Sequence, residues 1–291
     1  MQTPNRLIEK VGVVSNNVDE KTVESFGEEW NSFHGFSEKE IKVIGDMYFD
    51  IVKPEMFTRE ARIIDIGCGS GRFIKYIRER YEHQLIVGID PSSAILAADS
   101  LLGTDEKVIL VQAAADNIPY PENYFDFAYS LGVLHHIPDT QKALNDSVKI
   151  LKPGGYFLLY LYYNLDNRNF FFKAIFHLSN LVRSVVSKMP AKAKKITCDV
   201  LAILLYMPFV LMCRLLKRLG VPETVRKYIP LQGYERQTFY VIRNDSLDRF
   251  GTPLEQRFSR KQIKIMMEKA GLHDVVFSEK IPYWHAIGLK N

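Results

Sequence analysis

The chain has 291 residues, of which 47% are hydrophobic and 25% charged, and its formal net charge is +4. This composition excludes an intrinsically disordered chain, and the length allows a core domain with a large insertion. Cys68, Cys198 and Cys213 have spacings that match neither a disulfide framework nor a zinc site, so we expect a cytoplasmic setting and no metal. Met1–Lys10 has no apolar stretch behind a basic start, and we therefore expect no signal peptide.

Residues 1–60 are predicted to form an N-terminal helical cap, separate from any sheet. From Ala61 onwards, short apolar runs alternate with amphipathic stretches, a pattern typical of a doubly wound α/β domain. We expect strands over Ala61–Ile66, Leu85–Asp90, Lys107–Gln112, Phe125–Ser130 and Tyr156–Tyr163. We expect helices over Arg72–Tyr81, from Pro91 through Ile95–Leu102, and from an N-cap at Asp139 to Leu151, where Lys152–Gly155 ends the last one. Residues 61–163 thus form the predicted α/β core.

The pattern breaks over residues 164–256, which we interpret as a basic helical insertion. Within it, Asn164–Pro230 holds twelve Lys/Arg against three Asp/Glu, a formal charge of +9, which leaves −5 for the rest of the chain. Val200–Cys213 is an uncharged run of 14 residues that contains Pro208. Because a bilayer span needs about 20 apolar residues and Pro208 should interrupt the run, we expect no transmembrane helix.

Three interpretations of the insertion stay open from sequence alone. It could be a helical lid over a large or hydrophobic acceptor, a homodimer contact, or a peripheral basic surface on an anionic membrane through residues 164–230. Nucleic acid is not expected as a partner, because no interleaving of aromatic and basic residues accompanies the charge.

The α/β pattern resumes in residues 257–291, which are predicted to complete the core. Ser259 and Gln262 have the spacing of a capping box, and the helix that they open is predicted to end at Gly271. Strands are expected over His273–Ser278 and Tyr283–Leu289.

The most informative segment is the glycine-rich turn Asp65–Gly71, between a predicted strand and a predicted helix. Glycines let the backbone approach a ligand closely, and a helix N-terminus presents free amide groups. A dinucleotide fingerprint needs a small residue where Arg72 stands, which weakens a nicotinamide-dependent alternative. The tighter turn suits S-adenosylmethionine, with Asp65 orienting the loop and approaching the amino acid end of that ligand. A purely structural turn remains the plainer alternative.

Two further acids follow predicted strands. Asp90 ends the second strand 19 residues after Gly71, where a carboxylate can accept both ribose hydroxyls, although a solvated strand-end acid is an alternative. Asp116 comes just after the third strand, where it can accept a hydrogen bond from an adenine amine. Since nicotinamide enzymes do not usually require an acid there, Asp116 favours the methyl donor.

These motifs resemble the small-molecule branch of class I S-adenosylmethionine-dependent methyltransferases, similar to those that act on quinones and secondary metabolites. The matching residues are Asp65–Gly71, Gly88–Pro91, Ala115–Pro121, Tyr124–Phe127, Leu131–Pro138 and Leu151–Gly155. The resemblance implies a seven-stranded sheet of order 3-2-1-4-5-7-6, with the last strand antiparallel and the cofactor over the C-terminal ends of the first three. The cofactor-binding residues predicted on these grounds are Asp65, Gly67, Cys68, Gly69, Gly71, Asp90, Pro91, Ala115, Asp116, Asn117 and Leu131.

Candidates for the acceptor side follow the fourth and fifth strands. His135 and His136 are the nearest candidates for a general base, although the resemblance favours packing or a contact with the methionine part of the cofactor. Substrate contacts are predicted for Tyr160, Tyr162 and Tyr163, which as strand residues could equally be core, and for Arg243. Phe26–Trp30 looks like a helix that folds over the cofactor in related enzymes, which adds Trp30 to the substrate side, with plain packing as the alternative.

We therefore expect methyl transfer from S-adenosylmethionine to a small-molecule or lipid-like acceptor, with oxygen favoured over nitrogen or sulfur. A non-catalytic cofactor-binding scaffold at a membrane or partner is the alternative of another class.

Overall fold

The computed structural model describes residues 8–10, 15–33, 35–167 and 170–291, so most of Met1–Lys10, on which the signal-peptide expectation rests, lies outside it. The chain divides into two compact units. Met1–Asp166 together with Leu254–Asn291 forms what we call the sheet unit, and Asn167–Pro253 forms the helical unit. Each is described by itself below.

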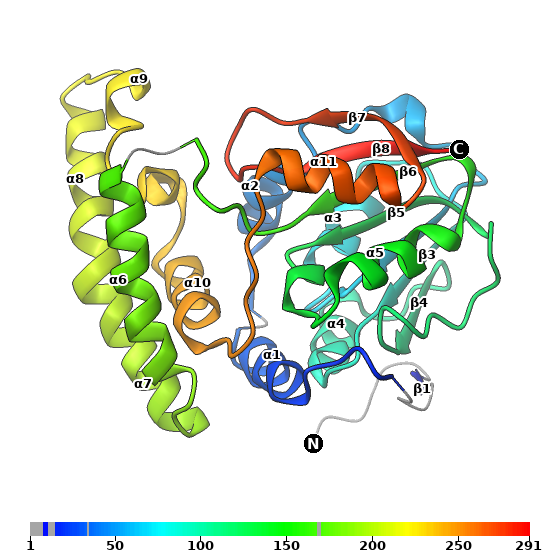
Figure 1. Ribbon diagram of the computed structural model, residues 1–291, viewed down its shortest axis with the longest axis horizontal. Helices are drawn as coiled ribbons and strands as arrows, with labels where there is room; N and C mark the ends of the chain where they lie inside the picture. The colour runs from blue at the N-terminus through cyan, green and yellow to red at the C-terminus, as the bar shows by residue number, and fades with distance from the viewer. Residues whose placement is uncertain (1–7, 11–14, 34, 168–169) are drawn as a thin grey trace. The chain divides into compact units, whose positions relative to one another are not determined.

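The sheet unit is built on a mixed sheet of order β1-β4-β3-β2-β5-β6-β8-β7 (Figure 1). Strand β8 is antiparallel to both β6 and β7, whereas the other pairs are parallel. The predicted order 3-2-1-4-5-7-6 is therefore confirmed for β2 to β8. The strands are β1 (Glu9–Lys10), β2 (Arg62–Ile66), β3 (Leu85–Ile89), β4 (Val108–Gln112), β5 (Phe125–Leu131), β6 (Leu151–Tyr160), β7 (Leu272–Phe277) and β8 (Ala286–Lys290).

Two expectations about the strands were wrong. The N-terminal region is not wholly separate from the sheet, because β1 pairs in parallel with the edge strand β4. Strand β6 begins at Leu151, so Lys152–Gly155 belongs to the strand; a register shift opposite Phe125 and Phe127 accommodates Pro153 there. The strand ends at Tyr160, and Tyr163 makes only an isolated bridge to Phe258.

Helices cover the sheet in the manner of a doubly wound fold. Helices α5 and α11 pack together, as do α3 and α4, with α1 against α4 and α2 against α3 (Figure 1). Central strands such as β2 and β3 are almost continuously buried, as expected where helices cover both faces. The helices are α1 (Glu20–Ser32), α2 (Glu38–Tyr48), α3 (Arg72–Arg78), α4 (Ala94–Leu102), α5 (Thr140–Lys149) and α11 (Arg260–Lys269), with 3-10 turns at Pro54–Met56 and Leu134–His136.

Local signals in the sequence place most of these helix ends. The Asp139 side chain accepts a hydrogen bond from the backbone amide of Lys142 at 2.9 Å, and Ser259 with Gln262 forms the predicted capping box. Helix α4 begins at Ala94 rather than at Pro91, because the Asp90 carboxylate holds the Ser92 amide in a turn before the helix.

The helical unit contains α6 (Phe170–Val186), α7 (Ala191–Leu201), a π-turn (Ala202–Tyr206), α8 (Met207–Arg218), α9 (Glu223–Arg226), a 3-10 turn (Gln232–Arg236) and α10 (Phe239–Gly251). Segments α7 to α8 form one helix of 28 residues, Ala191–Arg218, which we call the long helix. The expected interruption at Pro208 was wrong. The Met207 amide bonds to the Ala202 carbonyl, an i to i+5 step that widens the turn before Pro208, which has no amide hydrogen to donate.

The expectation that the chain has no transmembrane helix rested on the short uncharged run and on a break at Pro208, but the long helix continues through Pro208. Within the part of the chain that the structure describes, it is the one helix long and apolar enough to cross a membrane by length and composition.

Candidate functional site

The glycine-rich turn between β2 and α3 has a backbone that only glycine adopts easily. Gly67, Gly69 and Gly71 have φ angles of +81°, +52° and +76°. At Gly67 a Cβ atom would also lie 2.4 Å from the side chain of Val133. The turn therefore needs glycine both for its conformation and for its close packing.

The end of β3 holds this turn in place. The amides of Gly67 and Cys68 both donate to the last carbonyl of β3, at 2.8 and 2.9 Å, and the Gly69 amide donates to Asp90 Oδ2 at 3.0 Å. Asp90 Oδ1 accepts from the amide and hydroxyl of Ser92, at 2.9 and 2.6 Å. The structure thus brings the predicted ribose ligand and the predicted cofactor turn into direct contact. A carboxylate has about four acceptor positions, so Asp90 keeps capacity for a further donor.

Asp65, at the end of β2, is buried, and its Oδ2 atom has no hydrogen-bond partner among the described residues. Burial, reinforced by the nearby charge of Asp90, raises the pKa of Asp65 well above its ordinary value. A buried acceptor left unsatisfied costs free energy and is suited to receive a cationic group. S-adenosylmethionine carries an ammonium and a sulfonium, so this acid fits the predicted cofactor.

Asp116 follows β4, between Ala115 and Asn117, at the same edge of the sheet. Its carboxylate accepts from the Ser15 hydroxyl at 2.6 and 2.7 Å and lies 3.6 Å from Lys142 Nζ. The structure therefore pairs Asp116 with the N-terminal segment, and its role toward adenine stays a prediction. No pattern in the sequence pointed to Ser15.

Helix α1 lies across the glycine-rich turn and the start of α4. The Trp30 indole packs so closely that a Cβ on Gly69 would lie 3.0 Å from its Nε1 atom, and the Arg72 guanidinium stacks on the indole at 4.9 Å. At Gly27 a Cβ would lie 2.6 Å from Ser93 Oγ, so glycine permits this approach. Helix α1 thus packs over the glycine-rich turn, and its closure over a bound cofactor stays a prediction. Arg72 is held by aromatic rings beside the turn.

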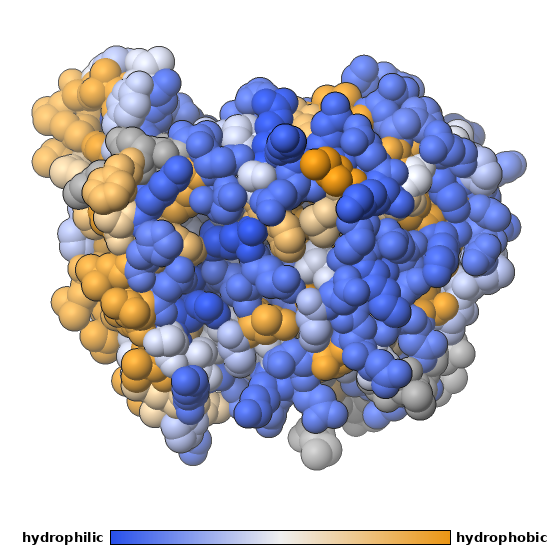
Figure 2. Space-filling view, in the orientation of Figure 1, coloured by the Kyte–Doolittle hydropathy of each residue, from blue (hydrophilic) through white to orange (hydrophobic). Residues whose placement is uncertain are grey.

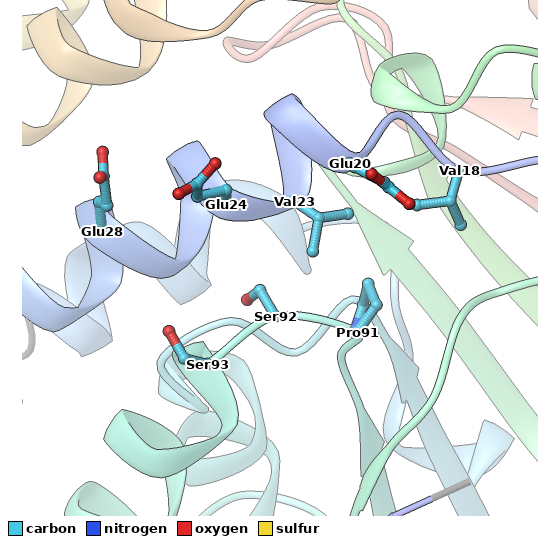
Figure 3. A pocket seen from close by; sticks show the side chains of 8 residues that line it. All are labelled: Val18, Glu20, Val23, Glu24, Glu28, Pro91, Ser92 and Ser93. Carbon is cyan, nitrogen blue, oxygen red and sulfur yellow. The ribbon is translucent and has the colours of Figure 1, made fainter. Parts of the chain in front are cut away.

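A pocket of about 370 Å³ lies between α1 and the β3–α4 loop (Figure 3). Glu20, Glu24 and Glu28 of α1 contribute to one side of it, with the carboxylates of Glu24 and Glu28 pointing away from the opposite loop, and Val23 points toward the loop that follows Asp90. The predicted cofactor residue Pro91 is part of the opposite wall. This opening therefore borders the tip of β3. Its lining residues are Val18, Glu20, Val23, Glu24, Glu28, Pro91, Ser92 and Ser93.

The two histidines after β5 differ in their surroundings. Leu131 ends β5, and His135 follows in a 3-10 turn with its ring centroid 3.9 Å from those of both His136 and Tyr162. Burial, together with the neighbouring His136 and Arg257, lowers the pKa of His135 well below its ordinary value. His135 therefore stays neutral and serves packing better than proton transfer.

His136 is oriented by a defined hydrogen bond. Its Nδ1 atom lies 2.6 Å from the backbone carbonyl of Leu254, so Nδ1 carries the proton of the neutral ring and the Nε2 lone pair is the acceptor. Phe26 of α1 meets the ring edge to face, with centroids 4.8 Å apart. Of the two predicted bases, His136 has the tautomer that can accept a proton.

Aromatic rings surround these histidines. The Tyr160 ring lies 5.2 Å from that of Tyr48 on α2, and Tyr162 lies 5.0 Å from the Arg257 guanidinium. Arg257 also donates to the Tyr163 carbonyl at 3.1 Å. The structure thus joins the predicted tyrosines to the histidines. It adds Tyr48 and Arg257, and Tyr48 could not be foreseen because nothing in α2 predicts its packing partners.

Arg243, the remaining predicted substrate residue, belongs to α10 of the helical unit. Its guanidinium makes a bidentate ion pair with Asp199 at 2.8 and 2.6 Å. Its contact with a substrate stays a prediction. Among the described residues, no three His, Cys, Asp or Glu side chains gather in a way that could hold a metal ion.

Comparisons with known proteins agree with this geometry. Residues 64–159 match the family described as "Methyltransferase domain". The chain is 35% identical over 104 residues to the ubiquinone/menaquinone biosynthesis C-methyltransferase UbiE of Vibrio cholerae, covering 34% of this chain and 40% of that protein. It is 26% identical over 144 residues to the sterol 4-C-methyltransferase strm-1 of Caenorhabditis elegans, covering 47% and 43%. The chain thus spans less than half the length of these relatives.

The fold is also that of a solved methyltransferase. Human N-acetylserotonin methyltransferase, solved in complex with S-adenosylmethionine, superposes with a TM-score of 0.53 and 15% identity, over 91% of this chain and 56% of that one.

Proposed function

We propose that this chain, whose residues 64–159 match a methyltransferase domain, is a class I S-adenosylmethionine-dependent enzyme that transfers a methyl group to a hydroxyl of a small, lipid-like acceptor. One observation carries the proposal. The turn Gly67–Gly71 is clamped by Asp90 and lies beside Asp65, a buried acid with an unsatisfied oxygen.

The residues present fit the cofactor. Gly67, Gly69 and Asp65 would receive its amino acid end, Asp90 its ribose and Asp116 its adenine. When bound, S-adenosylmethionine supplies a methyl group on a positively charged sulfur. Helix α1, with Trp30 over the turn, excludes water from that region.

His136 is the proposed general base. Its Nδ1 proton is held by the Leu254 carbonyl, so Nε2 can take the proton of an acceptor hydroxyl as that oxygen gains the methyl group. Arg257 stacks on Tyr162 and pairs with Glu255 at 2.8 Å, so its charge is balanced and the guanidinium fixes the tyrosine ring that contacts the imidazole. A general base of this kind accelerates a reaction by roughly 10²–10⁴-fold, and the positioning of donor and acceptor supplies the remaining rate enhancement.

A lipid-like acceptor is supported by the aromatic lining near His136. Tyr160, Tyr162 and Phe26 present ring faces and edges there, which suits apolar or aromatic molecules. The names of the relatives, a quinone and a sterol methyltransferase, agree with such an acceptor.

Carbon is the second candidate for the methylated atom. Both relatives are named as C-methyltransferases, and a base that removes a phenolic or enolic proton would activate a ring carbon as readily as an oxygen.

The test is turnover of the purified chain with methyl-labelled S-adenosylmethionine and a panel of quinols, phenols and sterols. S-adenosylhomocysteine formed only with an acceptor, and a methoxy signal in the product by NMR, is the expected result. A methyl group bound to carbon in the product would show that carbon, the second candidate, is the methylated atom instead of oxygen. Cofactor binding without turnover across the panel would favour a non-catalytic scaffold.

A further inference from the structure

The helical unit exposes apolar side chains to an unusual degree. Seventeen of the 21 large hydrophobic residues that are exposed in the described chain lie in Asn167–Pro253. Among them, Leu178 on α6 and Leu204 on the long helix are each 64% exposed. In Figure 2, hydrophobic side chains gather over α6 to α9. Scattered exposed leucines need no explanation, but a continuous set on adjacent helices does.

The long helix has two different faces. One face is buried inside the helical unit, against α10 along α7 and the π-turn and against the turn Gln232–Arg236 along α8. It carries Cys198, Ala202, Tyr206, Val210 and Cys213. The opposite face, which we call the outer face, carries Ile196, Val200, Ile203, Leu204, Leu211 and Leu215, all exposed. Both sets recur at helical spacing, so the helix is apolar on the side that the unit does not cover.

Polar interactions fix which side faces inward. On the inner side, Asp199 pairs with Arg243 of α10, and the Ser246 hydroxyl donates to the Cys198 carbonyl at 2.8 Å. Near the other end, Arg214 donates to the carbonyls of Glu235 and Gln237. Rotating the helix to hide the outer face would break these bonds, so the exposure is built into the unit.

Charge accompanies the apolar face. The segment 167–253 has fifteen Lys/Arg and five Asp/Glu, a formal charge of +10, whereas the whole chain carries +4. Lys188 and Lys192 are exposed where α6 passes into the long helix, and Lys217 and Arg218 are exposed at its far end. Positive charges that flank an apolar helix face are the pattern of interfacial helices on anionic membranes.

We propose that the helical unit docks in the plane of an anionic phospholipid bilayer, with the outer face of the long helix among the acyl chains and the flanking Lys and Arg at the headgroups. An anionic membrane, rather than a second copy of the chain, is the partner that matches the charge of this surface. A second copy would bring a like charge of +10 against this surface, whereas anionic lipid neutralises it while accepting the leucines.

The long helix lies along the membrane rather than across it. Its 28 residues span about 42 Å, but the uncharged stretch Val200–Cys213 covers only about 21 Å of a hydrocarbon layer about 30 Å thick. Its inner side is bonded to a polar helix with Arg243, Asp245 and Asp248, which would have to enter the bilayer too. A charged partner of this kind is costly in hydrocarbon and acceptable at the interface.

Flotation of the full chain with phosphatidylcholine vesicles, with and without phosphatidylglycerol, tests the proposal and requires no methyl donor. We expect binding that is strongest with the anionic lipid and weakens as salt is added. Leu204→Glu with Leu211→Glu should lower the partition coefficient at least ~10-fold. The matched control, Ile265→Glu with Val276→Glu, places the same charges at exposed apolar positions of the sheet unit and should change it less than ~2-fold.

Further variants and readouts separate the other outcomes. Lys192→Ala with Arg218→Ala should weaken binding to anionic vesicles about 10-fold and leave neutral vesicles unaffected. The proposal is overturned if no vesicle binds, or if the two glutamate pairs behave alike. It is also overturned if light scattering shows a dimer that the Leu204/Leu211 pair dissociates, or if bound protein resists alkaline extraction, as a spanning helix would.

Discussion

The two units of this chain use the same residue types in opposite ways. The sheet unit carries a formal charge of −6 and keeps its large aliphatic residues on buried strands, whereas the helical unit carries +10 and exposes leucines along one helix face. The chemistry proposed here lies in the sheet unit, where buried polar groups such as Asp65 and His136 are placed at strand ends. The residues proposed for catalysis and those proposed for membrane docking thus lie in different units. Variants in the helical unit should leave methyl transfer unchanged, and variants in the sheet unit should leave vesicle binding unchanged.

The largest effect is expected at His136. His136→Gln keeps a side chain that can hydrogen-bond the Leu254 carbonyl but removes the proton acceptor at Nε2, so kcat should fall by roughly 10²–10⁴-fold. The affinity for S-adenosylhomocysteine should change little, and vesicle binding should not change. Steady-state kinetics with a responsive acceptor measures the first quantity. An unchanged kcat would remove His136 from the mechanism.

A second variant tests the glycine-rich turn. Gly67→Ala places a Cβ against Val133 at a positive φ, so it should destabilise the fold by roughly 2–4 kcal/mol and weaken cofactor binding. Gly103→Ala is its control, because that residue also has a positive φ but nothing within 4 Å of an added Cβ. Chemical denaturation and calorimetry would compare the pair. Equal losses in both would show that close packing at Gly67 is unimportant.

Asp65 offers a test that separates stability from binding. Because burial raises its pKa above the ordinary 3.8, the folded state holds a proton that the unfolded state releases first, and stability falls as the pH rises through the raised pKa. Asp65→Asn removes this loss, so it should be more stable than the parent at neutral pH by roughly 1–3 kcal/mol, and alike at low pH. It should bind the cofactor more weakly. Thermal denaturation across pH tests the sign, and a less stable variant at neutral pH would contradict it.

The smallest effect concerns His135. Since its pKa is lowered from the ordinary 6.5 by burial, the unfolded chain takes up a proton that the folded one refuses, and stability falls as the pH drops below 6.5. His135→Phe keeps a ring against Tyr162 and removes this pH dependence. The free energy of unfolding of the parent should therefore change with pH more steeply than that of the variant, by up to about 1.4 kcal/mol per pH unit. Denaturant titrations between mildly acidic and neutral pH measure the slope. Parallel slopes would mean that His135 is charged in the fold.

The strands and helices of the sheet unit could be predicted because their signals are local, whereas the order of the strands was implied by the family resemblance. Apolar runs such as Leu85–Ile89 mark buried strands, and parallel strands bring their C-terminal ends to one edge, so the meeting of Gly69 with Asp90 follows from topology. Contacts between distant segments could not be predicted in this way. Ser15 on Asp116 joins residues about a hundred positions apart, and no periodicity encodes such a pairing.

The helical unit shows a different limit. Pro208 predicts a break by the usual rule, and the structure avoids the break with a π-turn, which the side-chain pattern does not reveal. The exposed apolar face could be foreseen only as an amphipathic helix with several possible partners. Which face is covered from within is decided by contacts such as Asp199 with Arg243.

The most direct test of the central claim is calorimetry of the purified, ligand-free chain with S-adenosylhomocysteine. The account predicts saturable binding at one site per chain, abolished or strongly weakened in Gly67→Ala and retained in Gly103→Ala and in the Leu204/Leu211 glutamate pair. Absence of binding by the folded parent chain would contradict it.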